Sequence, residues 1–396
     1  MKTYQMGDYE IRVLRDAKER REAEASVLAA GQGLAMAHRQ IFAEASGIAA
    51  QWFMEIRNGR GESMGGFAID VNRSRAMPGH LLLRIERFGE GIVAEVLDAT
   101  VQAVSNLACR KWRILRVNIE TFSRHSECAA RLNASLARCG FKPVADARRY
   151  QKTLLVDLSP DEAAVFASLH GTARRHIRAI AKHPVQIRPI RERIWVPRMN
   201  ELVRETMDRT GGVFRETNWG PRISMTNENP NLASLLGLFR TDRDGPDSLL
   251  AFAWSCMNGD YAHYDAAAST RNTDLKLPLN YAVAWEHIRW AKANGARWYD
   301  FGGITAGRNG DQTDRLGGIS DFKRYFSKHE IEVGGEWMLE PHWLRAKVAR
   351  RVSAAAGWLS SLSGRPKGRQ NGFSAHGLGD GSTPAAPLQD TVAGSE

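Results

Sequence analysis

Long hydrophobic runs are missing from this sequence. No stretch of its 396 residues approaches the roughly 20 consecutive apolar residues that a membrane-spanning helix requires. The N-terminal residues, MKTYQMGDYEIRVLRD, also lack the apolar core of a secretory signal peptide. We therefore expect a soluble, cytoplasmic protein.

Cysteine is scarce, and its spacing is uninformative for metal binding. The four residues, Cys109, Cys128, Cys139 and Cys256, form no CxxC pair and have no nearby histidine at metal-ligand spacing. We expect reduced thiols and no metal site. No Ser-His-Asp or Cys-His signature is present either, which argues against a covalent acyl-enzyme mechanism.

Acidic residues are absent from one region. The stretch 341–370 holds seven lysines and arginines and no acid, within a chain of net charge +11. Such a balance suits an anionic partner such as a nucleotide, a nucleic acid or an acidic polymer. A soluble, arginine-rich protein without such a partner would have the same composition.

A pattern of hairpin, helix and strand occurs in the first half of the chain. Two apolar segments, 51–56 and 63–70, flank a polar turn that contains Asn58-Gly59. They are followed by an expected strand, helix, strand and helix, at 81–88, 92–108, 113–120 and 125–139, and Gly140 ends the last helix.

The second half repeats this pattern. Segments 248–257 and 260–269 predict two strands joined by Asn258-Gly259. A helical spacing of apolar residues over 281–291 ends at Gly295, and RWYDFGG (297–303) predicts a strand that runs into a glycine pair. The repetition predicts two related mixed α/β domains.

Three segments are expected from these boundaries: an N-terminal domain over 1–175, a C-terminal domain over 176–345, and a basic amphipathic segment with a tail over 346–396. A helix is predicted over 161–183, with Ser159 as its N-cap. Beyond about residue 360 the composition is rich in Gly, Ser and Pro, which predicts disorder.

Two parts of the sequence resemble a known family. Segment 261–325 contains YAHYDAAAS, RWYDFGG and GGISDFKRY, and it resembles the C-terminal half of the Fem-type (FemABX-like) transferases. The passage 130–190 resembles the region between the two domains of that family. The resemblance implies a fold class of α/β (α+β), with two tandem GNAT-like (acetyltransferase-like) domains, each a mixed central sheet flanked by helices.

The resemblance also implies a reaction. Fem-type enzymes transfer an aminoacyl group from aminoacyl-tRNA, or an acyl group from another activated carrier, directly onto an amine. The implied acceptor is an amine-bearing molecule such as a peptidoglycan precursor, possibly nucleotide- or lipid-linked, and no cofactor is implied. Two alternatives stay open: an acyl-CoA-dependent N-acyltransferase, and a non-catalytic module that binds tRNA or a polyanion.

The expected catalytic residues are Lys323 and Asp300. Lys323 matches the FK motif of the family, where a cation would stabilise negative charge that develops on a carbonyl oxygen. Asp300 ends a predicted strand, at a position where α/β sheets hold ligands, and would orient Lys323 or accept a proton. Each residue also has a structural interpretation, as a solvated lysine and as a turn-capping carboxylate.

Further residues are expected to bind substrate, chiefly from the resemblance. They are Phe322, Gly302, Gly303, Tyr264, Arg271, Asn280, Arg209, Arg215 and Trp219. The glycine pair would expose backbone N–H groups, and the arginines suit phosphate or carboxylate recognition. His263 is adjacent to Tyr264 on a predicted strand, so the two point to opposite faces, and a structural role is preferred for this histidine over that of a base.

Two other segments bear on partners. The nearest match to the coenzyme A fingerprint of GNAT proteins is residues 315–320, an imperfect one, which favours a different donor. The basic amphipathic stretch 342–362 is compatible with peripheral contact at an anionic membrane, although packing of its apolar stripe on the second domain is the simpler interpretation. We expect a monomer, because both halves of the site lie in one chain.

Overall fold

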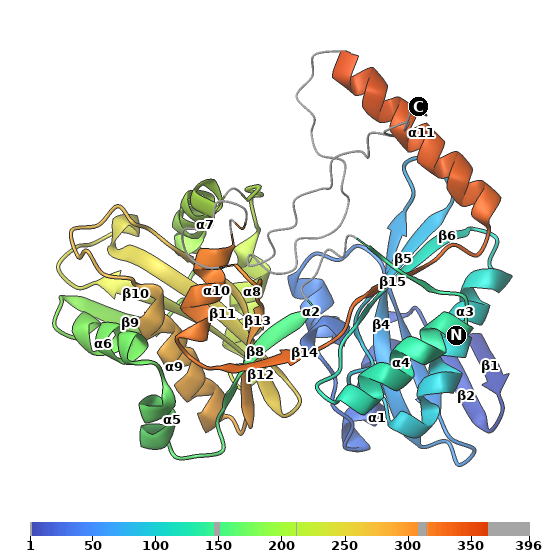
Figure 1. Ribbon diagram of the computed structural model, residues 1–396, viewed down its shortest axis with the longest axis horizontal. Helices are drawn as coiled ribbons and strands as arrows, with labels where there is room; N and C mark the ends of the chain where they lie inside the picture. The colour runs from blue at the N-terminus through green and yellow to red at the C-terminus, as the bar shows by residue number, and fades with distance from the viewer. Residues whose placement is uncertain (1, 146–150, 211, 308–313, 315, 363–396) are drawn as a thin grey trace, which may run out of the picture.

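The computed structural model consists of two mixed α/β domains that lie side by side (Figure 1). It describes residues 2–145, 151–210, 212–307, 314 and 316–362, with side chains as far as residue 355. The tail that was expected to be disordered lies largely outside these residues. No helix in the described ranges is long and apolar enough to cross a membrane.

The first domain is built on an eight-stranded sheet in the order β1-β2-β3-β4-β5-β6-β15-β7. Its strands are β1 (Lys2–Met6), β2 (Tyr9–Leu14), β3 (Gln51–Arg57), β4 (Ser63–Arg73), β5 (Leu81–Phe88), β6 (Ile114–Thr121), β7 (Lys142–Pro143) and β15 (Glu336–Leu339). Its helices are α1 (Ala17–Ala29), α2 (Gln40–Ala45), α3 (Leu97–Arg110) and α4 (Ser126–Arg138).

The second domain is built on a seven-stranded sheet in the order β14-β8-β13-β12-β11-β10-β9. Its strands are β8 (Lys152–Asp157), β9 (Val185–Pro189), β10 (Ala233–Arg240), β11 (Leu249–Asn258), β12 (Tyr261–Ser269), β13 (Trp298–Gly303) and β14 (His329–Glu332). Its helices are α5 (Glu162–Ser168), α6 (Gly171–Ile180), α7 (Val196–Thr210), α8 (Trp219–Glu228), α9 (Asn280–Ala293) and α10 (Gly317–Arg324).

The repeated pattern is confirmed in the two sheets. Each contains an antiparallel hairpin, β3-β4 or β11-β12, and one parallel pair, β5-β6 or β12-β13, whose strands are connected by helix α3 or α9. The turn and helix-end glycines adopt the left-handed conformation that L side chains disfavour, with φ of +66° at Gly259, +82° at Gly295 and +84° at Gly140. The expected fold class is therefore confirmed.

The domain boundary expected at 175/176 stays a prediction. The division of the chain between the two sheets lies at a different place. Strand β8 and helices α5 and α6 precede residue 181 and belong to the second domain. Near the C-terminus the chain returns, and β15 pairs with β6 in the first sheet. The domains are therefore connected by two segments of the chain.

The single helix predicted over 161–183 is wrong. Two helices, α5 and α6, occupy this segment, because Leu169 and His170 have extended backbone, with ψ of 150° and 144°. Leu169 is buried in the core, and the His170 imidazole accepts a hydrogen bond from the Thr172 N–H, which caps α6. The N-cap of α5 is Asp161 and not Ser159.

The two domains are packed together through buried side chains. Phe42 of α2 stacks on Trp254 of β11, with ring centroids 5.8 Å apart and an interplanar angle of 12°. Close by, the Met36 N–H donates a 2.6 Å hydrogen bond to Asn258 Oδ1 at the β11-β12 turn. Burial of this apolar surface between the domains favours one fixed arrangement of the two sheets.

Helix α11 (Trp343–Leu362) follows β15 and extends away from the body beside the first domain (Figure 1). Arg345 donates a 2.7 Å hydrogen bond to the Trp112 carbonyl, and Arg350 forms an ion pair with Glu340. The expected packing of its apolar stripe on the second domain is wrong, because that stripe is exposed.

Candidate functional site

A cavity of about 100 Å³ lies where the two domains meet. Strands β12 and β13 pair in parallel only as far as His263 and Asp300, and they separate beyond these residues. The second domain contributes the middle of β12, the carboxyl end of β13, the beginning of β8 and Lys323 of α10. Residues 120–122 and Arg87 of the first domain line the opposite side. A cavity at separating strand ends is a common place for ligands in α/β proteins.

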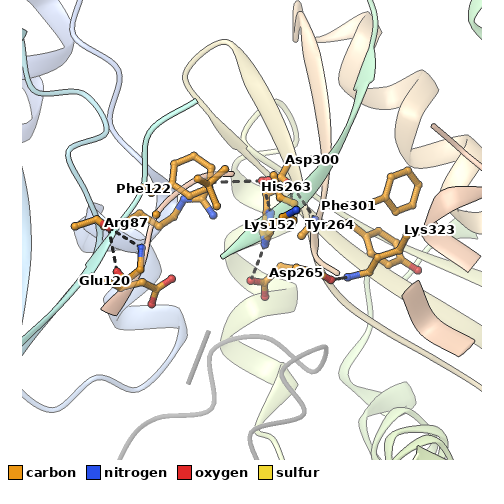
Figure 2. Close-up of a pocket in the computed structure, with 17 residues that line it drawn as sticks. Arg87, Glu120, Phe122, Lys152, His263, Tyr264, Asp265, Asp300, Phe301 and Lys323 are labelled. Carbon is orange, nitrogen blue, oxygen red and sulfur yellow. Dashed lines mark hydrogen bonds and ion pairs between the residues drawn. The ribbon is translucent and has the colours of Figure 1, made fainter. Parts of the chain in front are cut away.

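Figure 2 shows the charged groups of this cavity: Arg87 on one side, His263 and Asp300 in the middle, and Lys323 on the other. They come from β5, β12, β13 and α10, which are far apart in the sequence. Glu120, Lys152 and Asp265 line the same cavity, so the fold gathers three cations, three carboxylates and an imidazole around one space.

Lys323 is buried, with only 6% of its surface exposed. Its Nζ donates a 2.6 Å hydrogen bond to the Gly303 carbonyl, which holds the amine at the wall of the cavity. A lysine is rarely buried without polar partners, because the loss of hydration is costly. The alternative interpretation of Lys323 as a solvated lysine is thus ruled out, and its side chain lies on the wall of the cavity.

Asp300 is almost fully buried, with 1% exposure. Its Oδ1 accepts hydrogen bonds from the Thr153 hydroxyl and from the Gly302 N–H, the latter at 2.7 Å. Burial alone would raise the pKa of Asp300, but the contact with His263, the Arg87 charge and the Thr153 hydroxyl together lower it below its usual range. Asp300 is therefore a carboxylate at neutral pH.

His263 lies between two carboxylates. Its Nδ1 is 3.4 Å from Asp300 Oδ2, and its Nε2 is 4.0 Å from Asp265 Oδ1. The register of β12 against β11 shifts between Trp254 and Ser255, and this irregularity lies beside Asp265. β-Bulges of this kind often re-aim side chains near active sites. His263 lies on the wall of the cavity, and the structural role preferred from the sequence stays a prediction.

Gly302 separates His263 from Lys323. Its φ of +74° is a conformation that L side chains rarely adopt, and an added Cβ would lie 3.2 Å from His263 Cε1 and 3.8 Å from Lys323 Nζ. The imidazole and the amine therefore both lie within 4 Å of one point. Only glycine leaves the space between them open.

Arg87 closes the site from the first domain. Its Nη2 lies 3.6 Å from Asp300 Oδ2 and donates a hydrogen bond to the Tyr261 hydroxyl, while its Nε donates a 2.9 Å hydrogen bond to Glu90. The guanidinium carbon lies 3.6 Å from the centre of the Phe122 ring, a cation–π contact. Arg87 itself has φ of +47°, which is uncommon outside glycine and occurs at functional sites.

Tyr264 lines the cavity and packs on Phe301, with ring centroids 5.4 Å apart. Its hydroxyl is buried and has no hydrogen-bond partner among the described residues. Burial raises the pKa of Tyr264, so the phenol stays neutral. An unpaired buried hydroxyl beside a cavity is a ready donor or acceptor for a ligand.

Of the eleven predicted site residues, five line the cavity: Lys323, Asp300, Tyr264, Gly302 and Gly303. Phe322 does not line it but supports it, because its ring packs on Phe301 and Phe326. Asn280 begins α9, and its buried Oδ1 has no hydrogen-bond partner in the described parts of the chain.

The other four lie elsewhere. Arg209, at the end of α7, donates a 3.5 Å hydrogen bond to the Ser269 carbonyl, and its pKa is lowered by burial and by the nearby charge of Arg271. Arg271 and Arg215 are exposed. Trp219 is completely buried and packs on Phe252, so its predicted contact with substrate does not fit the structure.

Sequence reasoning missed Arg87, Phe122, Thr153 and Asp265 altogether. One signal was available for Asp265, because residues two apart on a strand share a face and Asp265 is two residues from His263. No comparable signal marks the residues of the first domain.

Two sequence predictions concern a metal site and a coenzyme A site. Within the described residues, no three His, Cys, Asp or Glu side chains are grouped so that they could hold a metal ion. Of the segment 315–320, residue 315 lies outside the described residues, and residues 317–320 begin α10. The absence of a coenzyme A site stays a prediction.

Part of this site lies in a segment that is similar to a known protein family. Residues 241–353, which include β12, β13 and α10, match the model of the FemAB family. No curated protein matches the sequence.

Solved structures agree with this family match. The structure of FemX is similar with a TM-score of 0.65 and 15% sequence identity, over 85% of this chain and 97% of that one. The structure of L-PGS from Bacillus licheniformis is similar with a TM-score of 0.50 and 12% identity, over 84% and 96% of the two chains. The resemblance to the Fem-type transferases is therefore confirmed, because residues 241–353 match the FemAB family and the fold is similar to that of FemX.

Proposed function

We propose that this protein is a transferase that moves an aminoacyl group from an aminoacyl-tRNA onto an amine by direct attack. One observation carries the proposal: the Lys323 amine and the His263 imidazole lie on either side of Gly302, in a cavity where Asp300 is held as a carboxylate. These are the two functions that aminolysis of an ester needs, a cation for the oxyanion and an acceptor for the proton.

Lys323 would act on the carbonyl oxygen of the donor ester. As the acceptor amine attacks the carbonyl carbon, the C=O electron pair moves to oxygen, and the ammonium group can donate to that oxygen. The burial of Lys323 strengthens such an interaction, because charges attract more strongly where water is excluded.

His263 would accept the proton that the amine loses. Nε2 lies 4.0 Å from Asp265 Oδ1, which is beyond hydrogen-bond distance, while Nδ1 faces Asp300. The new C–N bond forms as the bond between the carbonyl carbon and the tRNA oxygen breaks, and His263 returns the proton to that oxygen. No covalent enzyme intermediate is required, in agreement with the lack of a nucleophile signature in the sequence.

Asp300 is a positioning residue in this scheme. A carboxylate beside Nδ1 favours the tautomer that carries its proton on Nδ1 and leaves Nε2 free as a base. Arg87 and Thr153 hold the carboxylate in turn. Asp300 was first expected to orient Lys323 or to accept a proton. We assign it the orientation of His263 instead, because Asp300 contacts His263.

The choice of donor and acceptor rests on the comparisons and on charge. The FemAB match and the net charge of +11 support a tRNA-borne donor, since a basic protein attracts a polyanion. An amine on a cell-envelope precursor is the acceptor class that this family supports. The neighbouring guanidinium groups of Arg209 and Arg271 suit an anionic part of that acceptor, such as a phosphate. A cytoplasmic, monomeric enzyme is part of the proposal.

The donor is tested by incubation of the purified protein with cell extract and a pool of tRNAs that carry labelled amino acids. Label should pass into molecules that resist ribonuclease, and the tRNA that supports transfer identifies the amino acid. Transfer from acyl-CoA but from no tRNA would move the assignment to an N-acyltransferase. Binding of tRNA without transfer from either donor would favour the non-catalytic module.

A further inference from the structure

Helix α11 carries a row of exposed apolar side chains. Leu344, Val348 and Val352 recur every four residues and are 60%, 52% and 43% exposed, and Trp343 beside them is 63% exposed. The small side chain of Ala346 is instead buried against the body. The helix thus contacts the body through Ala346 and presents its larger apolar residues to the outside, the reverse of ordinary core packing.

Trp112 extends this apolar row onto the body of the first domain. It lies between α3 and β6, it is 55% exposed, and its backbone carbonyl accepts the hydrogen bond from Arg345 of α11. Of the eight exposed large hydrophobic side chains in the described residues, four are on α11, and a fifth, Trp112, lies where α11 contacts the surface of the first domain. We call these five side chains, Trp112, Trp343, Leu344, Val348 and Val352, the apolar ridge.

Basic residues border the apolar ridge. On α11 these are Arg345, Lys347 and Arg351, and beside Trp112 they are Arg110, Lys111 and Arg113. The nearest acid, Glu340, is already paired with Arg116 and Arg350. The ridge and its border therefore combine apolar anchors with uncompensated positive charge.

We propose that the apolar ridge binds the surface of an anionic lipid bilayer. Aromatic and aliphatic side chains on a basic amphipathic helix enter the boundary between headgroups and acyl chains, and the neighbouring cations attract anionic headgroups. Two exposed tryptophans strengthen this match, because tryptophan prefers the membrane interface. A partner without negative charge would not attract the basic residues of the border. A nucleic acid in solution would not bury the exposed apolar side chains. This inference does not depend on the proposed transferase activity.

The test is flotation of the full-length protein with vesicles of phosphatidylcholine, with and without phosphatidylglycerol. Wild-type protein should float with the anionic vesicles and stay behind with the neutral ones, and added salt should weaken binding. The triple variant Trp343→Ser, Leu344→Ser, Val348→Ser should bind at least about tenfold more weakly. A matched control, Ile194→Ser with Val213→Ser, removes exposed apolar side chains elsewhere and should bind like wild type.

A second variant tests how much the positive charges contribute to vesicle binding. Lys347→Gln with Arg351→Gln should weaken binding roughly fivefold per charge, because each cation near an anionic surface contributes about that factor. Equal binding to both kinds of vesicle, no binding of wild type to either, or full binding of the triple variant would each overturn the proposal. So would self-association without lipid that the triple variant abolishes, since the occupant would then be a second copy of this chain.

Discussion

Arg87 of the first domain contacts Asp300 of the second, with Nη2 3.6 Å from Oδ2. The two residues are far apart in the sequence, and the contact forms only when the two sheets are packed together. It connects the fold with the chemistry, because the same carboxylate faces His263.

Replacement of Arg87 by alanine should destabilise the protein by about 3–5 kcal/mol, the usual result when one partner of a buried charge pair is removed. Asp300 would then lose a neighbouring cation while still buried. Urea unfolding followed by fluorescence measures the change. Arg138→Ala is the control, because the pair of Arg138 with Asp98 is exposed and should contribute no more than about 1 kcal/mol. Equal effects of the two substitutions would contradict this view of the domain contact.

Replacement of Asp300 by asparagine should change how stability depends on pH. The pKa of Asp300 is lower in the folded protein than in the unfolded chain, so its stabilising effect is complete above about pH 4 and is lost as the pH falls further. The variant should be roughly 2–3 kcal/mol less stable than wild type near neutral pH, and the difference should shrink in acid. A difference that is the same at all pH values would mean that the carboxylate charge is unimportant.

Replacement of Gly302 by alanine tests the space between His263 and Lys323. The positive φ alone costs about 1–2 kcal/mol for an L residue. Gly295→Ala is a matched control, because Gly295 has φ of +82° but no atom within 4 Å of an added Cβ. Both variants should lose similar stability, and only Gly302→Ala should lose transferase activity as well. Full activity of Gly302→Ala would show that the open space is not needed.

Glu24, in the first domain, should make the stability of the protein depend on pH in the opposite direction. Burial raises the pKa of Glu24 to about 7, so the folded protein keeps a proton that the unfolded chain releases from about pH 4.5 upward. Stability should fall as the pH rises from about 4.5 to 7 and stay lower above that. Glu24→Gln should remove this loss and become more stable than wild type at alkaline pH, by up to about 3 kcal/mol.

The control for this change is Glu44→Gln. The pKa of Glu44 is lowered, because its hydrogen bonds with Gln40 and Arg21 outweigh partial burial. Calorimetric melting at several pH values compares the two variants. A stabilising effect of both substitutions would point to general charge repulsion and not to burial of Glu24.

His263→Gln tests the proposed base. It should lower kcat with little change in KM, because the proton is transferred in the transition state and not on binding. His329→Gln, which removes an exposed histidine of β14, should have no effect. A variant that changes only KM would assign His263 to substrate binding.

Local patterns predicted much of this fold, since both hairpins, the helix that ends near Gly295 and the glycine pair at the end of β13 follow from turn residues and apolar spacing. Tertiary burial explains the failures. Trp219 lies in a polar segment that suggested a binding residue, yet its indole fills the core. Arg87 was missed because Tyr261 and Asp300, which connect it with the site, are on the other domain, and no spacing along the chain relates them to Arg87.

The sequence also predicted only part of the site. The family resemblance marked Lys323, the end of a predicted strand marked Asp300, and both residues line the cavity. The pairing of Asp300 with His263 depends on the parallel register of β12 and β13, which places the two residues opposite each other. A strand register between distant segments is a tertiary property, and hydrophobic alternation alone does not specify it.

The most direct test of the central claim is the rate of label transfer from aminoacyl-tRNA to the acceptor in cell extract, measured for Lys323→Ala and for Lys328→Ala. Lys328 is an exposed lysine in the same segment, so its loss removes the same charge without altering the cavity. Loss of a preorganised oxyanion donor typically costs about 100- to 1000-fold in rate, and we expect this for Lys323→Ala while Lys328→Ala retains wild-type transfer. Transfer at the wild-type rate by a folded Lys323→Ala variant would contradict the proposed mechanism.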